Sequence, residues 1–385
     1  GNNILTAFPV MGGKTMKYAV VGFGTAGYHA VKKIRELDKE GCIDVYSNTE
    51  RAPYNPMLTT YYAFGKLEYE GMFPFGDLEQ IQKEVDFNLR KETVIKVHGS
   101  EHLVETENGS EQYDRILIAT GARAFAPPVK GLEPEDAFLM RTVEDALRFK
   151  DRLKKNDIKH AVVIGASMAG IKVVEVLHKY GIETWLLDLA SYIFPLAAYK
   201  EVAKEIEKRV EAQGVHLMFG VTIDHMEQEN GEKTAVLTDG SRIPADIVGL
   251  CIGTRAITET VQGEVEIGRG IVVDDHMRTS VPGIYAAGDC CEGNNLESGQ
   301  NQIIGLWANA NHQGETAGIN MAGGDMAYKG NILHNITHFM NMDFIGFGDN
   351  RMQGEILEYG SLSEDLYIRL VLDGKRIVGA NILDN

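Results

Sequence analysis

Two stretches of the same form decide the fold, KYAVVGFGTAG at residues 17–27 and HAVVIGASMAG at residues 160–170. Each begins with a short apolar run typical of a buried strand, continues through a glycine-rich turn and opens a helical pattern. A strand, a glycine-rich loop and a helix in this order start a βαβ unit that holds a dinucleotide diphosphate. Two such units predict two bound dinucleotides and electron transfer between them.

The sequence around both stretches continues the βαβ pattern. Helices are predicted at 26–37, 168–179 and 198–213, and strands at 43–46, 114–120, 183–187, 247–252 and 283–287. Asn230-Gly231 and Asp239-Gly240 predict tight turns among strands in 215–238. Asp373-Gly374 predicts a hairpin of 366–372 with 377–382 in a small C-terminal module.

Composition limits the function. The chain has 385 residues, 44% of them hydrophobic, so two or three domains are expected. A net charge of −17 argues against nucleic acid as a partner. No apolar run reaches the ~20 residues of a membrane helix. The N-terminal extension, 1–15, lacks the basic and apolar segments of a secretory signal, and Met16 is a plausible original start. Four cysteines without metal-ligand spacing suggest no metal site and a cytoplasmic location.

The first glycine-rich loop has the residues that binding of a dinucleotide diphosphate requires. Gly22 allows the tight turn, Gly24 lets the backbone approach a diphosphate, and Gly27 permits close packing of helix on strand. An acidic residue at the end of the next strand is expected to bind the ribose hydroxyls. Glu50 is our candidate, although it comes later than the usual ~20 residues, and Asn48 or Thr49 could mark the true strand end.

The second loop predicts a nicotinamide dinucleotide. Gly165, Ser167 and Gly170 take the three glycine positions, with serine as a small replacement. Asp188 ends the following strand, where a carboxylate pairs with a free ribose 2′-hydroxyl and repels a 2′-phosphate. The next three residues, 189–191, include no arginine or lysine. NADH is therefore favoured over NADPH.

Five motifs in order give a specific resemblance. KYAVVGFGTAG, YDRILIATGAR, AVVIGASMAG, VPGIYAAGDC and ANANHQGETAG resemble the FAD- and NAD-dependent pyridine nucleotide-disulfide oxidoreductases, over about 17–323. DFIGFGD and YIRLVLDGKRIVGANILDN resemble the short C-terminal module of NADH:rubredoxin reductases and nitrite reductase flavin domains. PYNPMLTTYYAFG, at residues 53–65, resembles a stretch of the coenzyme A disulfide reductase and NADH oxidase branch.

The resemblance implies an α/β fold with two Rossmann-like domains and a small C-terminal α+β module. The FAD domain would be discontinuous, 16–125 and 249–325, with the NAD domain inserted at 126–248 and an interface or partner module at 326–385. Gly22, Gly24 and Gly27 would bind the FAD diphosphate. Thr120 and Gly121 would pack on FAD, and Asp289 would bond its ribityl chain. Leu306 and Trp307 would begin the helix that faces the flavin, and Gly253 would lie beside the nicotinamide.

Departures from the family pattern limit the chemistry. Met57 stands where relatives of the coenzyme A branch have a redox cysteine, and a thioether cannot form a thiolate or a mixed disulfide. Disulfide reduction through this position is therefore excluded. Thr60 and Tyr61 are further candidates for the flavin face.

Lys172 replaces a glutamate that relatives usually carry two residues after the last loop glycine. A lysine whose charged end extends to solvent, altered NAD binding, and a lysine that holds an anionic substrate all stay open. Cys290 and Cys291 are adjacent, and we expect a structural role rather than a redox pair. His334 and His338 have the spacing of one helical face, where a surface or dimer contact is expected rather than a metal site.

The resulting hypothesis is an FAD-dependent NADH oxidoreductase. No protein acid or base is required for hydride transfer between the cofactors. Without a redox cysteine, a small redox protein such as rubredoxin or ferredoxin is the leading electron acceptor, and a homodimer is an open alternative for the assembly. Two other functions stay open: a flavin-binding subunit or sensor with impaired NAD turnover, and a flavoenzyme that reduces a small organic substrate, a quinone or oxygen.

Overall fold

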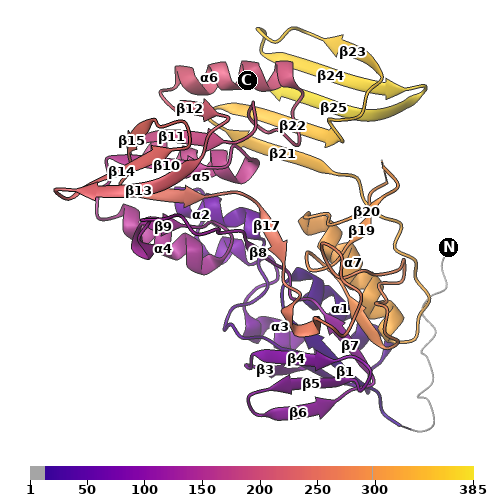
Figure 1. Ribbon diagram of the computed structural model, residues 1–385. Helices are drawn as coiled ribbons and strands as arrows, with labels where there is room; N and C mark the ends of the chain where they lie inside the picture. The colour runs from indigo at the N-terminus through magenta and orange to yellow at the C-terminus, as the bar shows by residue number, and fades with distance from the viewer. Residues whose placement is uncertain (1–13, 297) are drawn as a thin grey trace. The chain divides into compact units, whose positions relative to one another are not determined.

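A computed structural model describes residues 14–296 and 298–385 of the chain (Figure 1). Most of the expected N-terminal extension, residues 1–13, lies outside this description. Contacts divide the chain into two units, the first formed by Gly1–Asn55, Met72–Arg123 and Arg255–Asn331, the second by Pro56–Gly71, Ala124–Thr254 and Ile332–Asn385. Among the described residues, no helix is long and apolar enough to cross a membrane.

Unit 1 is built on a five-stranded parallel sheet of order β18-β7-β1-β2-β3. Its strands are β1 (Lys17–Val21), β2 (Cys42–Tyr46), β3 (Asn88–Arg90), β7 (Arg115–Ile118) and β18 (Ile284–Ala286). The central strands are almost fully buried, as expected for a parallel sheet covered on both faces. An antiparallel sheet and a short hairpin complete the strands of this unit, with β4 (Val94–His98), β5 (Leu103–Thr106), β6 (Gly109–Gln112), β19 (Gly293–Asn294) and β20 (Asn301–Gln302).

The helices of unit 1 are α1 (Thr25–Leu37), α3 (Leu78–Glu84) and α7 (Trp307–Met321). α1 and α7 touch along their lengths because Gly314 and Gly318 carry no side chain there. A Cβ on Gly314 would collide with the carbonyl oxygen of Ala26, and one on Gly318 would lie 2.5 Å from that of Ala30. This close approach fixes the start of α7 relative to the first glycine-rich loop.

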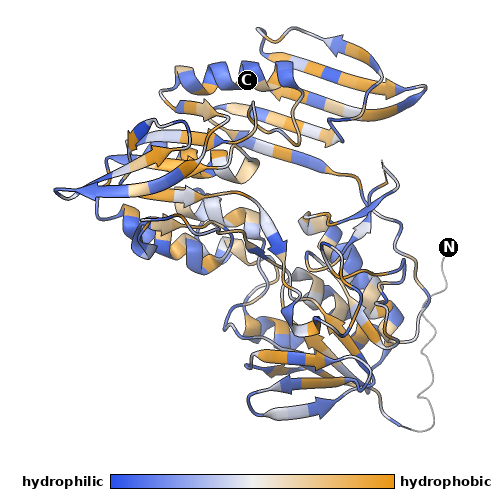
Figure 2. Cartoon of the chain, in the orientation of Figure 1, coloured by the Kyte–Doolittle hydropathy of each residue, from blue (hydrophilic) through white to orange (hydrophobic). Residues whose placement is uncertain are grey.

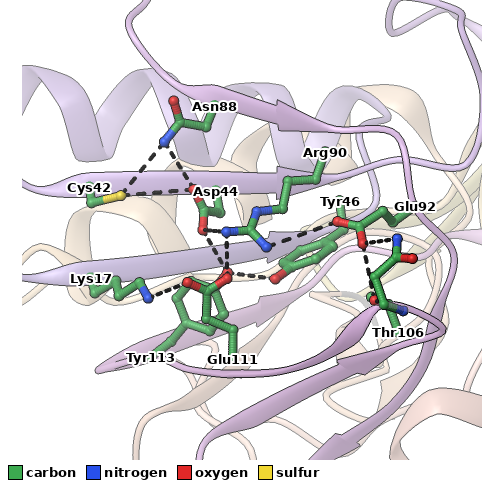
Figure 3. A network of polar contacts seen from close by, with 11 residues as sticks. Lys17, Cys42, Asp44, Tyr46, Asn88, Arg90, Glu92, Thr106, Glu111 and Tyr113 are labelled. Atoms are coloured by element: carbon green, nitrogen blue, oxygen red, sulfur yellow. Dashed lines mark hydrogen bonds and ion pairs between the residues drawn. The ribbon is translucent and has the colours of Figure 1, made fainter.

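A buried polar network joins β2 and β3 to the end of the β6 hairpin (Figure 3). Asp44 on β2 is 2% exposed and accepts hydrogen bonds from Tyr113 Oη at 2.6 Å and Asn88 Nδ2 at 3.0 Å. Arg90 lies 3.1 Å from the same carboxylate and also pairs with Glu111. Burial, together with the bond to Asp44, raises the pKa of Tyr113, so its hydroxyl stays a donor. The network thereby pairs a carboxylate that would be costly to bury alone.

Unit 2 contains a second parallel sheet, of order β12-β11-β10-β16-β9. Its strands are β9 (Ala137–Phe138), β10 (His160–Ile164), β11 (Glu183–Asp188), β12 (His216–Phe219) and β16 (Ile247–Leu250). An antiparallel sheet follows, with β13 (Ile223–Glu229), β14 (Glu232–Leu237) and β15 (Arg242–Pro244). The helices are α2 (Thr59–Phe64), α4 (Val143–Leu153), α5 (Met168–Lys179) and α6 (Lys200–Ala212). Short strands β8 (Ala122–Ala124) and β17 (Thr254–Ala256) lie where the chain passes between the units.

The C-terminal residues form a five-stranded antiparallel sheet of order β21-β22-β25-β24-β23. Its strands, β21 (His334–Phe339), β22 (Met342–Gly348), β23 (Glu355–Tyr359), β24 (Leu366–Asp373) and β25 (Arg376–Asp384), alternate hydrophobic and hydrophilic residues (Figure 2). Residues 326–385 contain no helix, so the helical part of the expected α+β module is not found there. The sheet packs instead against α6. The buried Arg369 of β24 donates a hydrogen bond to the carboxylate of Glu201 in α6 at 2.9 Å.

Local predictions agree closely with the structure, and two assignments need correction. β10 and α5 begin and end at the predicted residues, and Asn230 and Gly231 both take the positive φ of a tight hairpin turn. His334 and His338 lie on strand β21 and not on a helix. By its contacts, segment 56–71 belongs to unit 2, although we placed it within 16–125. The assignment of FAD and NAD to the two domains stays a prediction.

Candidate functional site

In unit 1 the residues predicted to bind FAD gather at one edge of the parallel sheet. Gly22 directly follows β1, Thr120 and Gly121 follow β7, and Asp289 follows β18. Because these strands are parallel, their carboxyl ends meet at the same edge, where ligands of such sheets bind. Thr120 Oγ1 donates a hydrogen bond to the carbonyl oxygen of Ile257 at 2.6 Å, which fixes this side of the edge.

The three glycines of the first loop differ in what surrounds them. A Cβ on Gly22, whose φ is +99°, would collide with the carbonyl oxygen of Ala119, and one on Gly27 would collide with that of Gly22. Gly24 is different, because no atom lies within 4 Å of where its Cβ would be. Gly22 and Gly27 therefore serve the packing of the loop, whereas Gly24 leaves open space at the N-terminus of α1. This space fits a diphosphate, which helix N-terminal amides attract.

The start of α7 supplies a second feature that fits FAD. Leu306 is the N-cap residue and Trp307 the first helical residue, as predicted. The Trp307 ring stacks on Phe75 at 6.1 Å between centroids, and Phe75 stacks on Tyr28 of α1 at 4.1 Å. The indole Nε1 of Trp307 is buried, and no described group lies within hydrogen-bond distance of it. A buried donor of this kind is costly unless a ligand accepts its proton.

The structure places Glu50 away from the position expected for a ribose ligand. Its side chain is 86% exposed and lies 3.9 Å from Lys91. Val21 is paired with Tyr46, so Ser47 is the residue that comes opposite Gly22. In unit 2 the corresponding register, Ile164 with Leu187, puts Asp188 in the same place. Ser47 is thus a candidate that counting residues along the sequence missed; comparing the two registers would have found it.

The second loop repeats the geometry of the first. A Cβ on Gly165, with φ +111°, would collide with the carbonyl oxygen of Cys251, and one on Gly170 would collide with that of Gly165. Ser167 is the N-cap of α5, and its hydroxyl oxygen accepts a hydrogen bond from Gly170 N at 3.1 Å. The serine therefore stabilises the helix N-terminus, which is where a diphosphate would bind.

Asp188 lies beside this loop with both carboxylate oxygens engaged. Ala166 N donates to Oδ2 and Ala190 N donates to Oδ1, each at 2.8 Å. These two backbone amides fix the Asp188 carboxylate beside Ala166, the residue that follows Gly165. A basic residue also comes to this loop, because Lys204 of α6 donates to the carbonyl oxygen of Ser191 at 3.1 Å. Lys204 could not be predicted at this loop from the sequence, because it belongs to the helix that follows the loop.

The remaining predicted residues are all in unit 2. Gly253 has φ +95° and open space where its Cβ would be, and its carbonyl oxygen accepts from Phe125 N at 2.8 Å. Met57 lies in a short 3₁₀ turn with 57% of its surface exposed. Thr60 is buried, and its hydroxyl donates to the Met57 carbonyl oxygen at 3.4 Å. Thr60 therefore acts locally to hold the turn that carries Met57.

Tyr61 and Lys172 are brought together by the packing of α2 on α5. The Lys172 Nζ lies 4.6 Å from the centroid of the Tyr61 ring, within the range of a cation–π contact. Lys172 is 8% exposed, and its Nζ is buried with no described hydrogen-bond partner. The reading of Lys172 as a lysine that reaches solvent is therefore wrong.

The cysteines are all free thiols. Cys290 and Cys291 are buried, and their Sγ atoms lie against carbonyl and amide oxygens at 3.3–3.4 Å, as expected for structural residues. Burial raises the pKa of Cys251 to about 12 and also raises the pKa of Cys42. Cys251 and Cys42 therefore do not resemble activated thiolates, whereas the contact with Cys291 lowers the pKa of the buried Cys290 and raises the pKa of Cys291.

Among the described residues one group could supply three metal-ligand atoms, Asp274, Asp275 and His276, within 4.8 Å of one another. The Asp274 carboxylate already accepts from Arg278 Nε at 2.7 Å, and Asp275 is exposed. Exposed acidic groups of this kind are common without an ion, so we assign no metal to them.

Comparison with known proteins agrees with this geometry. Residues 16–314 match the pyridine nucleotide-disulphide oxidoreductase family. The chain is 28% identical to the NADH-dependent phenylglyoxylate dehydrogenase subunit epsilon of Aromatoleum evansii, over 89% of this chain and 82% of that protein. It is 27% identical to the 3-phenylpropionate/cinnamic acid dioxygenase ferredoxin–NAD(+) reductase component of Photorhabdus laumondii, over 80% and 78%.

Among solved structures, the reduced CoADR-RHD of Bacillus anthracis superimposes with a TM-score of 0.88 at 26% identity, covering 96% of this chain and 71% of that one. The matched region contains both glycine-rich loops, Asp188 and the residues at the sheet edge of unit 1. This chain therefore belongs to the pyridine nucleotide-disulphide oxidoreductase family and is a flavin-dependent NAD(P)H oxidoreductase.

Proposed function

We propose that this chain transfers electrons from NADH, through bound FAD, to a small redox protein of the rubredoxin or ferredoxin class. Bound FAD would supply hydride acceptance and onward electron transfer, which is chemistry that protein side chains do not supply. The observation that carries the proposal is the state of the sulfur atoms. Met57 replaces the redox cysteine, and three of the four thiols are buried. Cys290 and Cys291 are adjacent but buried, and we assign them a structural role, so the electrons would leave to an external acceptor.

The protein contributes binding and orientation. The open space at Gly24 and the buried Trp307 Nε1 would hold FAD in unit 1. Ser167 and the N-terminus of α5 would hold the dinucleotide diphosphate in unit 2. Fixed geometry of this kind removes the entropic cost of bringing two reactants together.

Asp188 supports NADH as the donor. Its carboxylate is already held by two backbone amides, so it cannot turn away from a 2′-phosphate. Lys204, whose ammonium group reaches the adjoining loop, is 3.2 Å from the buried Glu207, which offsets its charge. We therefore propose that NADH is preferred over NADPH.

Two observations support a redox protein as the acceptor: Met57 in place of the redox cysteine, and the name of one relative. The Photorhabdus protein is named for a ferredoxin. The Aromatoleum protein is named as a subunit of a dehydrogenase, which favours the rival function of a flavin-binding subunit. Lys172 in place of the usual glutamate also favours that rival, in which NAD turnover would be impaired.

Anaerobic reduction separates these functions. NADH added to the FAD-loaded protein should bleach the visible flavin band, and rubredoxin or ferredoxin should restore it faster than a quinone or oxygen does. Failure of both NADH and NADPH to bleach the band would support the subunit. Bleaching followed by reoxidation by oxygen or a quinone alone would exclude a redox protein as acceptor.

The donor preference has its own test. Asp188→Arg should lower kcat/KM for NADH relative to NADPH by roughly tenfold or more, because it replaces an acceptor for the ribose hydroxyls with a phosphate-binding side chain. Glu229→Arg, at an exposed end of the β13–β14 hairpin, makes the same charge change and is the control. An equal effect of both variants would remove Asp188 from the argument.

A further inference from the structure

Lys172 is a buried cation for which the described residues provide no anion. It lies in α5, two residues after Gly170, and 8% of the residue is exposed. Its Nζ has no described hydrogen-bond partner, and it lies 4.6 Å from the centroid of the Tyr61 ring. Lysine is almost never fully buried unless it is paired. The attraction of an aromatic ring is smaller than the cost of removing an ammonium group from water.

The acid nearest in sequence does not serve Lys172. Glu175, one turn further along α5, pairs with Lys66 at 3.2 Å through Oε1. Its other oxygen accepts a hydrogen bond from Met340 N at 2.7 Å. Both oxygens of this carboxylate are therefore used, and the charge of Lys172 stays uncompensated within unit 2.

The surroundings of α2 are rich in positive charge. Four lysines lie over the aromatic rings of α2, with Lys66 over Tyr61 and Phe64, Lys150 over Tyr62, Lys172 over Tyr61 and Lys179 over Phe64. This concentration contrasts with the net charge of −17 of the whole chain. In addition, the N-terminus of α5, one turn before Lys172, carries the positive end of the helix dipole. The unpaired charge of Lys172 and the positive end of this helix dipole favour an anion at this place.

We propose that Lys172 and Tyr61 form a binding subsite for an oxyanion, a carboxylate or a phosphate, carried by a ligand of unit 2. The Lys172 ammonium group would donate a hydrogen bond to the oxyanion, and the Tyr61 ring would contact the same ammonium group from the other side. The inference deepens the proposed function, on which it depends for the identity of the ligand, but the subsite itself needs no turnover. The ligand that binds this subsite would therefore be one that carries an acidic group.

Two sources could supply this oxyanion. One is the diphosphate of the nicotinamide dinucleotide, which the neighbouring loop at Gly165–Gly170 would bind. The other is a separate organic acid or phosphate ester that binds to unit 2. Competition distinguishes them, because a diphosphate at Lys172 excludes added anions whereas a separate ligand leaves the subsite accessible when NAD⁺ is saturating.

The test measures anion binding on the FAD-loaded full chain. Inorganic phosphate and benzoate are the probes, and affinity is taken from the rise in unfolding temperature with probe concentration. Wild type and Lys172→Arg should bind, and Lys172→Met should bind roughly ten- to hundredfold more weakly, the usual effect of removing a charged hydrogen-bond donor. Lys179→Met is the matched control: this exposed lysine on the same helix donates to the Phe64 carbonyl oxygen, and its loss makes the same change in charge.

The outcomes decide the proposal. Binding lost in Lys172→Met and kept in Lys179→Met supports the subsite, and a repeat with saturating NAD⁺ identifies the source. Equal weakening in the two variants, or binding to none of the proteins, overturns it. If Lys172→Met does not fold, Lys172→Gln replaces it with the same expectation. Flavin bleaching by NADH is recorded in the same samples, so failed reduction with intact anion binding would refute the proposed function and leave the subsite standing.

Discussion

Gly24→Ala separates folding from cofactor binding within one loop. The residue has φ −84° and ψ −163°, values that any amino acid adopts, and its Cβ would meet no atom within 4 Å. Alanine therefore fits the folded chain without strain. We expect the free energy of unfolding of the apoprotein to change by less than about 1 kcal/mol, because the lower conformational entropy of the unfolded chain opposes the poorer N-cap that alanine makes for α1.

The expected effect on FAD binding is larger. The added methyl group would take the open space that we assign to the diphosphate at the N-terminus of α1. Displacing the diphosphate weakens the hydrogen bonds of the loop amides to a charged group, each worth about 1.5–3 kcal/mol. Loss of one such bond corresponds to a roughly ten- to hundredfold higher Kd for FAD.

Two measurements on the same protein check this reasoning. Chemical denaturation of the apoprotein gives the free energy of unfolding, and quenching of flavin fluorescence on titration gives the Kd. Gly27→Ala is the contrast, because its Cβ would collide with the carbonyl oxygen of Gly22 and should destabilise the fold itself. A Gly24→Ala protein that binds FAD as tightly as wild type would refute our placement of the diphosphate.

Three further variants test the packing around the sites. Asp44→Asn should lower the free energy of unfolding by about 3 kcal/mol, because it leaves Arg90 and Tyr113 facing a neutral amide in the buried network; denaturant unfolding measures this, and a change below about 1 kcal/mol would contradict it. Burial raises the pKa of Glu207 in the folded protein above its value in the unfolded chain. The contribution of Glu207 to stability therefore falls as the pH rises from the unfolded pKa through the folded pKa. Glu207→Gln should therefore raise the unfolding temperature more at pH 8 than at pH 4, and a gain independent of pH would be the contrary result. Arg369→Met should cost about 1–3 kcal/mol, since Arg369 bonds Glu201 and two groups on the C-terminal sheet; thermal unfolding checks it, and no loss would mean that these bonds are not stabilising.

The sequence predicted those parts of the fold that depend on neighbouring residues. Strand β10 and helix α5 follow from an apolar run, a glycine-rich turn and a helical period, all within twenty residues. The turn at Asn230-Gly231 follows from the positive φ that both residues tolerate. The C-terminal hairpin between β24 and β25 was predictable from Asp373-Gly374, where Gly374 takes a positive φ of 63° and Asp373 is the last residue of β24.

Contacts between distant segments could not be predicted in this way. Lys204 reaches the loop after β11 only because α6 folds back beside it. Segment 56–71 joins unit 2 through the packing of α2 on α5, where Lys179 donates to Phe64. The burial of the Lys172 Nζ depends on the same packing. A single sequence carries no local signal for any of these contacts.

The ribose ligand of FAD shows how the two units inform each other. Both units pair the first strand with the second in the same register, and the residue after that register is Asp188 in unit 2 and Ser47 in unit 1. A serine hydroxyl can bond a ribose hydroxyl but carries no charge to repel a phosphate. Discrimination between a 2′-hydroxyl and a 2′-phosphate matters for a nicotinamide dinucleotide and not for FAD, which has no phosphorylated counterpart to reject. If unit 1 binds FAD and unit 2 binds a nicotinamide dinucleotide, as we propose, the charged residue is found in the unit where this selection is needed.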